Sequence, residues 1–250
     1  MPVYKADGIV LHRRNLGETD KILTFFCRDH GKLSIVAKGA RRNASKLSGA
    51  TELFTHSRIL LAEGKSLDIV SQCEITECFP QLRTDLGRLS RATYFCELID
   101  RLMEDREPDS QVFDLLLSAL HLLQREDIML DVLVHAFELR LLAHRGYAPV
   151  LDQCVKCGQN LVGDKFAFSP SLGGVLCKAH RYAHEDAFAI QTKTVDTLQQ
   201  LMHNDVVALA DNTPKTDCMA EINRCMRWYI RYRIDRDLLS AEFLELIRAT

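Results

Sequence analysis

The chain has 250 residues, of which 47% are hydrophobic and 26% are charged. This composition excludes a disordered or collagen-like chain, and the length suffices for one large domain or two to three small domains with cores of their own. The net charge of −2 gives no overall attraction to an anionic polymer. The N-terminal third is nevertheless basic, because residues 1–80 carry 12 Lys and Arg against 9 Asp and Glu.

Short β-rich runs separated by turn residues fill residues 1–80 and predict five strands. The expected strands are Val3–Leu11, Lys21–Cys27, Lys32–Lys38, Leu53–Glu63 and Leu67–Thr76. The short connections at 29–31 and 63–66 predict antiparallel hairpins. Five strands in so short a segment favour a small closed sheet, either an oligonucleotide-binding (OB) fold or an SH3-like barrel, and the pattern alone does not separate the two.

After Pro80 the apolar residues recur at three- and four-residue spacing, which predicts helices. The expected helices cover residues 82–102, 112–123, 128–144, 194–203, 215–234 and 240–248. The fold class is therefore α+β, with an N-terminal five-stranded β-barrel at 1–80 followed by an all-α helical domain at 81–250. The chain has no apolar run of 18 residues, and it is expected to be a cytoplasmic protein that does not enter a membrane.

Two cysteine-containing pairs interrupt the helical region at about 150–185. Cys154 and Cys157 form one pair, and Cys177 and His180 form the other, 19 intervening residues later. Three thiolates and one imidazole can close a tetrahedral Zn²⁺ site with no position left for a substrate, so the pattern predicts a structural zinc element. His184 is an alternative fourth ligand, and unmetallated thiols in a loop are the other interpretation.

Enzyme motifs are incomplete in this sequence. Gly64-Lys65-Ser66 imitates the end of a phosphate-binding loop, but Ile59 stands where that motif needs glycine. His184-Glu185 starts a zinc-protease motif whose second histidine would fall on Phe188. The chain is therefore expected not to be an enzyme, and a zinc-dependent hydrolase remains the alternative.

The segment 31–51 carries five cations and no acidic residue. A flexible basic loop of this kind can follow a phosphate backbone, although solvated loops of similar charge are common. We predict DNA contacts from Lys32, Lys38, Arg41, Arg42 and Lys46 in this segment and from Arg13 earlier in the barrel region.

The predicted helix 215–234 has two faces, with arginines opposite an apolar side that includes Tyr229. One interpretation is a packed helix with a solvated basic face. The other is a binding site for a protein partner, formed by Arg224, Arg227, Arg231, Arg233 and Tyr229.

Several short motifs in a fixed order resemble the RecO family of DNA repair and recombination mediator proteins. They include Gly8–Leu11, Leu16–Asp20, Gly31–Ser34, Ala37–Arg41, Phe137–Leu142, Gly146–Pro149, Cys154–Gly158 and Gly173–Cys177. The family usually has a fourth cysteine where His180 stands here.

This resemblance implies an OB-fold barrel, a helical body with a zinc element and a mediator activity. A protein of this kind binds single- and double-stranded DNA, anneals complementary strands and helps load recombinase in the bacterial cytoplasm, at the nucleoid. Its expected partners are RecR and the C-terminal tail of single-strand binding protein (SSB). A scaffold that binds only proteins is the remaining alternative.

Overall fold

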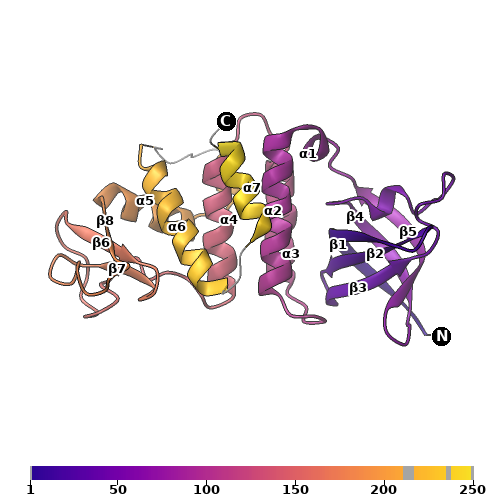
Figure 1. Cartoon of the computed structure of the whole chain (residues 1–250), viewed down its shortest axis with the longest axis horizontal. Coiled ribbons are helices and arrows are strands. Elements are labelled where there is room, and N and C mark those ends of the chain that lie inside the picture. The colour runs from indigo at the N-terminus through magenta and orange to yellow at the C-terminus, as the bar shows by residue number, and fades with distance from the viewer. Residues whose placement is uncertain (1, 211–216, 235–237, 249–250) are drawn as a thin grey trace. The chain divides into compact units, whose positions relative to one another are not determined.

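The computed structural model describes residues 2–210, 217–234 and 238–248. The chain divides into two compact units, of which the first comprises residues 1–124 and 239–250 and the second comprises residues 125–238. The barrel predicted for residues 1–80 lies within the first unit, together with the helices that directly follow it and the last helix of the described chain (Figure 1).

The five predicted strands form a closed barrel in the order β1-β2-β3-β5-β4. Their bounds are Val3–Leu16 for β1, Asp20–Cys27 for β2, Gly31–Ala37 for β3, His56–Ala62 for β4 and Asp68–Glu77 for β5. Both predicted hairpins are antiparallel, whereas β3 and β5 pair in parallel. This closure, with the strand order of an OB fold, decides between the two barrel types that the sequence left open.

Alternation along the strands explains why the barrel closes. Every second residue of β2 and β3, including Phe25, Leu33 and Ile35, points into one apolar core with residues of the other strands. Gly8 on β1 lies so close to the Phe25 ring that a Cβ atom would approach it within 2.5 Å. The barrel core therefore requires a residue without a side chain at this position.

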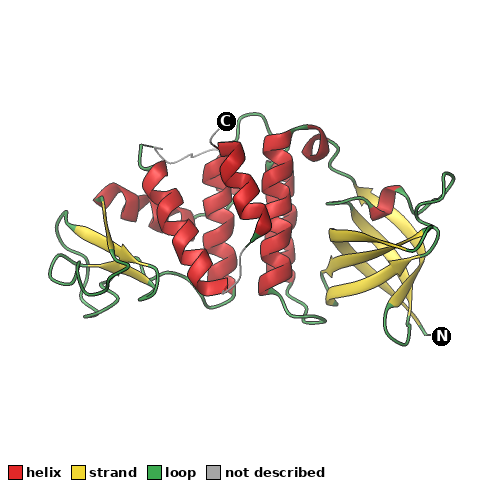
Figure 2. Ribbon diagram, in the orientation of Figure 1, coloured by secondary structure: helices red, strands yellow, loops and turns green. Residues whose placement is uncertain are grey.

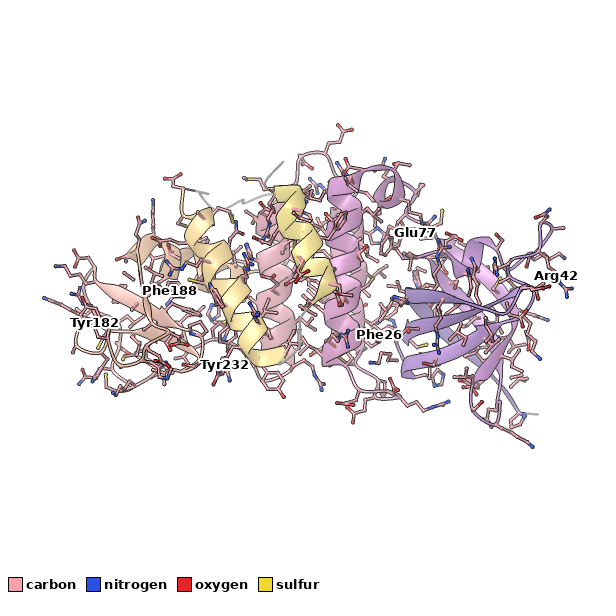
Figure 3. The ribbon with its side chains drawn as sticks, viewed as in Figure 1. Phe26, Arg42, Glu77, Tyr182, Phe188 and Tyr232 are labelled. Carbon is pink, nitrogen blue, oxygen red and sulfur yellow. The ribbon has the colours of Figure 1, made fainter. Side chains whose placement is uncertain are left out.

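The opposite face of β2 holds the barrel against the helices of the first unit. Phe26 is fully buried and its ring lies 6.2 Å from that of Phe113 on α3 (Figure 3). Arg28 forms an ion pair with Asp114 and lies over the Phe113 ring. These contacts place the barrel and α3 in one packed unit.

The helices of the first unit are α1 (Gln81–Thr84), α2 (Leu86–Leu102), α3 (Ser110–Leu122) and α7 (Leu239–Arg248), with a 3₁₀ turn, η1, at Gly49–Thr51. The single helix expected over 82–102 is broken at Asp85, whose side chain accepts the N–H of Arg88 and so begins α2. Asp109 caps α3 in the same way, as the Pro108-Asp109-Ser110 sequence predicts. In Figure 1, α7 lies beside α2, and Glu97 of α2 accepts the N–H of Ser240.

The second unit contains α4 (Leu130–His144), α5 (Thr192–His203) and α6 (Met219–Ile234), with a 3₁₀ turn, η2, at Val207–Ala210. The start predicted for α6, at Lys215, lies outside the described residues. The structure adds a small antiparallel sheet that the sequence did not predict, formed by β6 (Phe166–Ser169), β7 (Gly174–Leu176) and β8 (Phe188–Ile190) in the order β7-β6-β8 (Figure 2). Among the described residues, no helix has the length and apolar character that crossing a bilayer requires.

Candidate functional site

Three groups of predicted site residues can be located in the structure, and the group of metal-ligand candidates is the most compact. The ligand atoms of Cys154, Cys157, Cys177 and His180 all lie within 4.8 Å of one another. His180 Nδ1 is 3.4 Å from Cys177 Sγ and 3.8 Å from Cys154 Sγ. Ligand atoms around tetrahedral zinc stand about 3.5–3.8 Å apart, given Zn–S bonds of about 2.3 Å. The donor set and its spacing therefore fit one zinc ion.

Tight turns position these ligands. The N–H of Gly158 donates to the carbonyl of Cys154, and Gly158 adopts a φ of 70°, a left-handed conformation that glycine tolerates. The N–H of His180 donates to the carbonyl of Cys177 and closes the second turn. Each turn directs both of its ligands to the same point, which explains why the two-residue gaps predicted a site.

The surroundings of Cys154 favour its thiolate. Burial opposes ionisation, yet hydrogen bonds from the backbone N–H groups of Cys177, Cys157 and Lys156 lower the pKa of Cys154 to about 6. A thiolate is the form that ligates a metal. The alternative fourth ligand, His184, lies elsewhere, because its Nδ1 is 2.8 Å from Asp186 Oδ1 and 3.1 Å from Ser171 Oγ.

The second group is the basic loop between β3 and η1. Lys38, Arg41, Arg42 and Lys46 are exposed, and Arg42 lies at the outer edge of the barrel (Figure 3). The loop is anchored to the turn between β1 and β2, since Arg41 donates its N–H to Thr19 and its guanidinium to the carbonyl of Gly17. Four predicted DNA-contacting cations are thus presented together on one ordered loop.

Although residues 31–51 include no acidic residue, an acidic side chain from another part of the barrel lies beside them in the structure. Asp20 accepts the N–H of Gly39 at 2.8 Å. This hydrogen bond and one from Thr19 lower the pKa of Asp20, with Lys38 and Arg42 contributing. Asp20 therefore supplies one counter-charge at the base of the loop, and the sequence argument from missing counter-charge was wrong in this respect.

Two further predicted cations are engaged within the protein. Arg13 and the buried Lys21 both pair with Glu52. Burial opposes ionisation of Glu52, but the two cations outweigh this effect and lower the pKa of Glu52. Lys32 donates to the carbonyl of Asp100 at 2.6 Å and lies 3.3 Å from the Asp100 carboxylate. Arg13 and Lys32 thus stabilise the fold, and we leave them out of the proposed interface.

Sequence reasoning missed Arg14. A bulge between Val10 and His12 shifts the pairing of β1 with β2, and this changes which side chains face outward beyond it. Arg14 is exposed, close in sequence to the turn that anchors the basic loop, whereas Arg13 is only partly exposed. Strand alternation could have found this residue only if the bulge had been known.

The third group lies along α6, on the second unit. A groove with a volume of about 930 Å³ runs between α6 and the segment 170–188. Its α6 side consists of Arg224, Trp228, Arg231 and Tyr232, which share one helix face. The guanidinium of Arg224 lies 4.0 Å from the centre of the Phe188 ring, which lines the facing wall. The groove therefore combines two cations with exposed aromatic surface.

The other predicted partner residues of α6 lie outside this groove. Tyr229 is fully buried and donates its hydroxyl to the carbonyl of Tyr147, so it belongs to the core. Arg233 is packed against the rings of Tyr229 and Tyr232, and a Cβ on Gly173 would come within 2.3 Å of its guanidinium. Arg227 is exposed but does not line the groove.

Comparison with known proteins gives matches along nearly the whole chain. The family model for the N-terminal part of recombination protein O matches residues 1–79, and the model for its C-terminal part matches residues 83–242. A DNA repair protein RecO of Symbiobacterium thermophilum is 40% identical over 251 residues, covering 100% of this chain and 99% of that protein. The DNA repair protein RecO of Pelotomaculum thermopropionicum is 39% identical over 245 residues, covering 98% and 94%. The similarity thus extends over both compact units.

Proposed function

The chain belongs to the RecO family of DNA repair proteins, and from that premise we propose that it acts by holding DNA strands. In this proposal it binds single- and double-stranded DNA and anneals complementary strands. With RecR, it helps load recombinase on single-stranded DNA that SSB coats. These steps take place in the bacterial cytoplasm, at the nucleoid.

The basic loop carries the proposal. Lys38, Arg41, Arg42 and Lys46 are exposed on a loop that backbone hydrogen bonds hold to the β1–β2 turn, and Arg14 lies on β1 shortly before that turn. A loop whose backbone is already held in place loses little conformational freedom when its cations meet phosphates, and each contact releases counterions from the nucleic acid. Contacts with phosphates do not depend on the base sequence. A protein that pairs complementary strands of any sequence needs contacts of this kind.

The proposed activity needs no catalysis by the protein. The metal cluster offers four protein ligands to one ion, so a zinc hydrolase would lack the open coordination position that activates water. Zinc, when bound, would join the two turns that contain its ligands and supply no reacting group. The hydrolase interpretation therefore has less support than a structural metal.

The groove on α6 is the proposed site for the C-terminal tail of SSB. An acidic tail that ends in an aromatic residue would place its carboxylates near Arg224 and Arg231 and its ring against Trp228 or Tyr232. Glu185 and Asp186 on the opposite wall would repel such a tail and so restrict it to the α6 side. RecR remains a predicted partner without an assigned surface.

Strand binding and annealing by the purified full chain test the proposal. Fluorescence anisotropy with single- and double-stranded oligonucleotides of several sequences should show binding of both, with similar affinities across sequences. A quenching assay with two complementary labelled strands should show faster pairing than without protein. A protein that binds neither form at low salt would contradict the proposal and favour the scaffold alternative.

A further inference from the structure

The turns that hold the metal ligands also present a set of side chains outward. Three hydrogen-bonded turns start at Cys154, Cys177 and His180, and the N–H groups of Gly158, His180 and Ala183 close them. The intervening positions contain Lys156, Lys178, Arg181 and Tyr182. We call these four residues the knuckle surface. Each lies within two residues of a metal ligand, and the ligand atoms lie within 4.8 Å of one another, so the four residues border one compact ligand cluster.

Tyr182 is an aromatic residue that does not contribute to the core. Its side chain is 81% exposed, and it lies at the outer edge of this part of the chain (Figure 3). The following residue, Ala183, packs against the small apolar cluster beneath the ligands, which fixes the turn. The guanidinium of Arg181 lies 4.5 Å from the centre of the Tyr182 ring. An aromatic face is thus held in solvent by a fixed turn and an adjacent cation.

The charge of the knuckle surface is positive. Residues 154–182 contain four cations, namely Lys156, Lys165, Lys178 and Arg181, against one acidic residue, Asp164. The next carboxylates along the chain, Glu185 and Asp186, line the groove on α6. The aromatic ring is therefore bordered by cations.

We propose that the knuckle surface is a second contact site for single-stranded nucleic acid, in which a base stacks on Tyr182 and the backbone follows Lys156, Lys178 and Arg181. Every base has a π face, so stacking on an exposed ring is tolerant of sequence, and lysines beside it attract the phosphates. An acidic protein segment would use the same charges but would gain less from an isolated aromatic face. This inference rests on the proposed function, and it adds a site on the second unit to the one on the barrel.

The site gives annealing a physical basis. One chain with two separate strand contacts can hold two strands at once, which raises the effective concentration of one strand near the other. A single basic loop would have to exchange strands instead. Removal of the knuckle surface should therefore slow pairing more than it weakens binding of one strand to the barrel.

Photocrosslinking of a single-stranded oligonucleotide that contains iodouracil tests this site in the full chain. The expected result is a crosslinked peptide that includes Tyr182. The crosslink should persist in Tyr182→Phe, which keeps the ring, and should disappear in Tyr182→Ala. Tyr182→Ala should also slow annealing by about fivefold or more, the lower range for removal of one stacked base. Tyr147→Ala, which removes an exposed tyrosine elsewhere in the second unit, is the matched control and should match wild type in both assays.

The outcomes separate this inference from the proposed function. If wild type binds and anneals DNA while Tyr182→Ala does so equally well and crosslinks elsewhere, the knuckle surface is not a strand contact and only this inference fails. If wild type binds no single strand, both proposals fail. If Tyr182→Ala keeps DNA binding but no longer binds an acidic peptide, the surface serves a protein partner and the inference is overturned. Metal content and unfolding temperature of each variant confirm that it is folded.

Discussion

At the scale of single residues, buried charges stabilise the barrel through partners that are distant in the chain. Asp68 is 2% exposed and accepts hydrogen bonds from the hydroxyl of Tyr4 at 2.6 Å, the guanidinium of Arg106 at 2.9 Å and the N–H of Gly64 at 3.0 Å. Burial opposes ionisation of Asp68, but these donors outweigh it and lower its pKa. One carboxylate thus connects two strands and the β4–β5 turn to the segment that follows α2.

We expect Asp68→Asn to lower the free energy of unfolding by about 2 kcal/mol near neutral pH, because the variant lacks the charged acceptor of three hydrogen bonds. Since the folded pKa lies below the unfolded value of about 3.9, the carboxylate stabilises the fold above that pH and loses its effect as the pH falls through the folded pKa. Urea titrations of both proteins from pH 6 to pH 3 measure this difference.

The gap between wild type and Asp68→Asn should therefore be largest at pH 6 and shrink below about pH 4. Asp127→Asn provides the control, because Asp127 is exposed and pairs with its near neighbour Arg125, so it should change stability little at any pH. A difference for Asp68→Asn that stays constant down to pH 3 would contradict the role assigned to the charge.

At this scale the sequence predicted correctly which metal-ligand candidates lie together and which loop cations are exposed, because both signals are local. The four metal ligands and the exposed loop cations are short-range patterns. Arg13 and Lys32 were predicted from the local excess of cations, but their partners, Glu52 and Asp100, lie 39 and 68 residues away. No pattern within a window reveals an ion pair over that separation.

At the scale of elements, the strands of the barrel were predictable because each is a β-rich run of seven or more residues bounded by turn residues. β6, β7 and β8 have only four, three and three residues, which is too short for a period of two to be recognised. Their stability comes from packing: Ala167 of β6 and Leu176 of β7 share an apolar cluster with Cys154. The small sheet and the metal ligands therefore form one element.

We expect one zinc ion per chain by elemental analysis, and its removal should unfold this element. Chelation or Cys157→Ser should lower the unfolding temperature of the second unit and speed amide exchange in β6 and β7, because metal binding and folding of such a segment are coupled. Exchange in the barrel strands should stay unchanged. Cys78→Ser, an exposed cysteine outside the cluster, is the matched control. Metal-free protein with wild-type exchange in β6 would rule out a structural metal.

The groove on α6 predicts different effects for an arginine that lines it and an arginine of the same helix outside it. Arg231→Glu should weaken an acidic peptide with a C-terminal aromatic residue by about tenfold and slow its association most at low salt, because the arginine lines the groove. Arg227→Glu makes the same charge change on the exposed surface of the same helix, outside the groove, and should have a smaller effect. Surface plasmon resonance with the immobilised peptide gives both rates. Equal reductions in affinity for the two variants would indicate general charge attraction instead of a site.

At the scale of the whole molecule, the net charge of −2 does not reveal how the cations are distributed, and the proposed function depends on that distribution. A chain with this charge can bind a polyanion only if its cations are gathered, and the barrel gathers exposed cations on one loop with Arg14 nearby. The distribution of charge along the sequence therefore directed the proposed barrel site to the basic third of the chain. The bulge in β1 and the carboxylate of Asp20, which shape that site, became visible only in the folded barrel.

The salt dependence of single-strand binding tests this account most directly. The logarithm of the binding constant should fall linearly with the logarithm of salt concentration, and Arg41→Ala/Arg42→Ala should reduce the slope by about 1.4, or about 0.7 for each phosphate that is no longer neutralised. Arg125→Ala/Lys193→Ala removes two charges from the second unit and should leave the slope near that of wild type. A loop variant with the wild-type slope and affinity would contradict the claim that the basic loop of the barrel holds the DNA backbone.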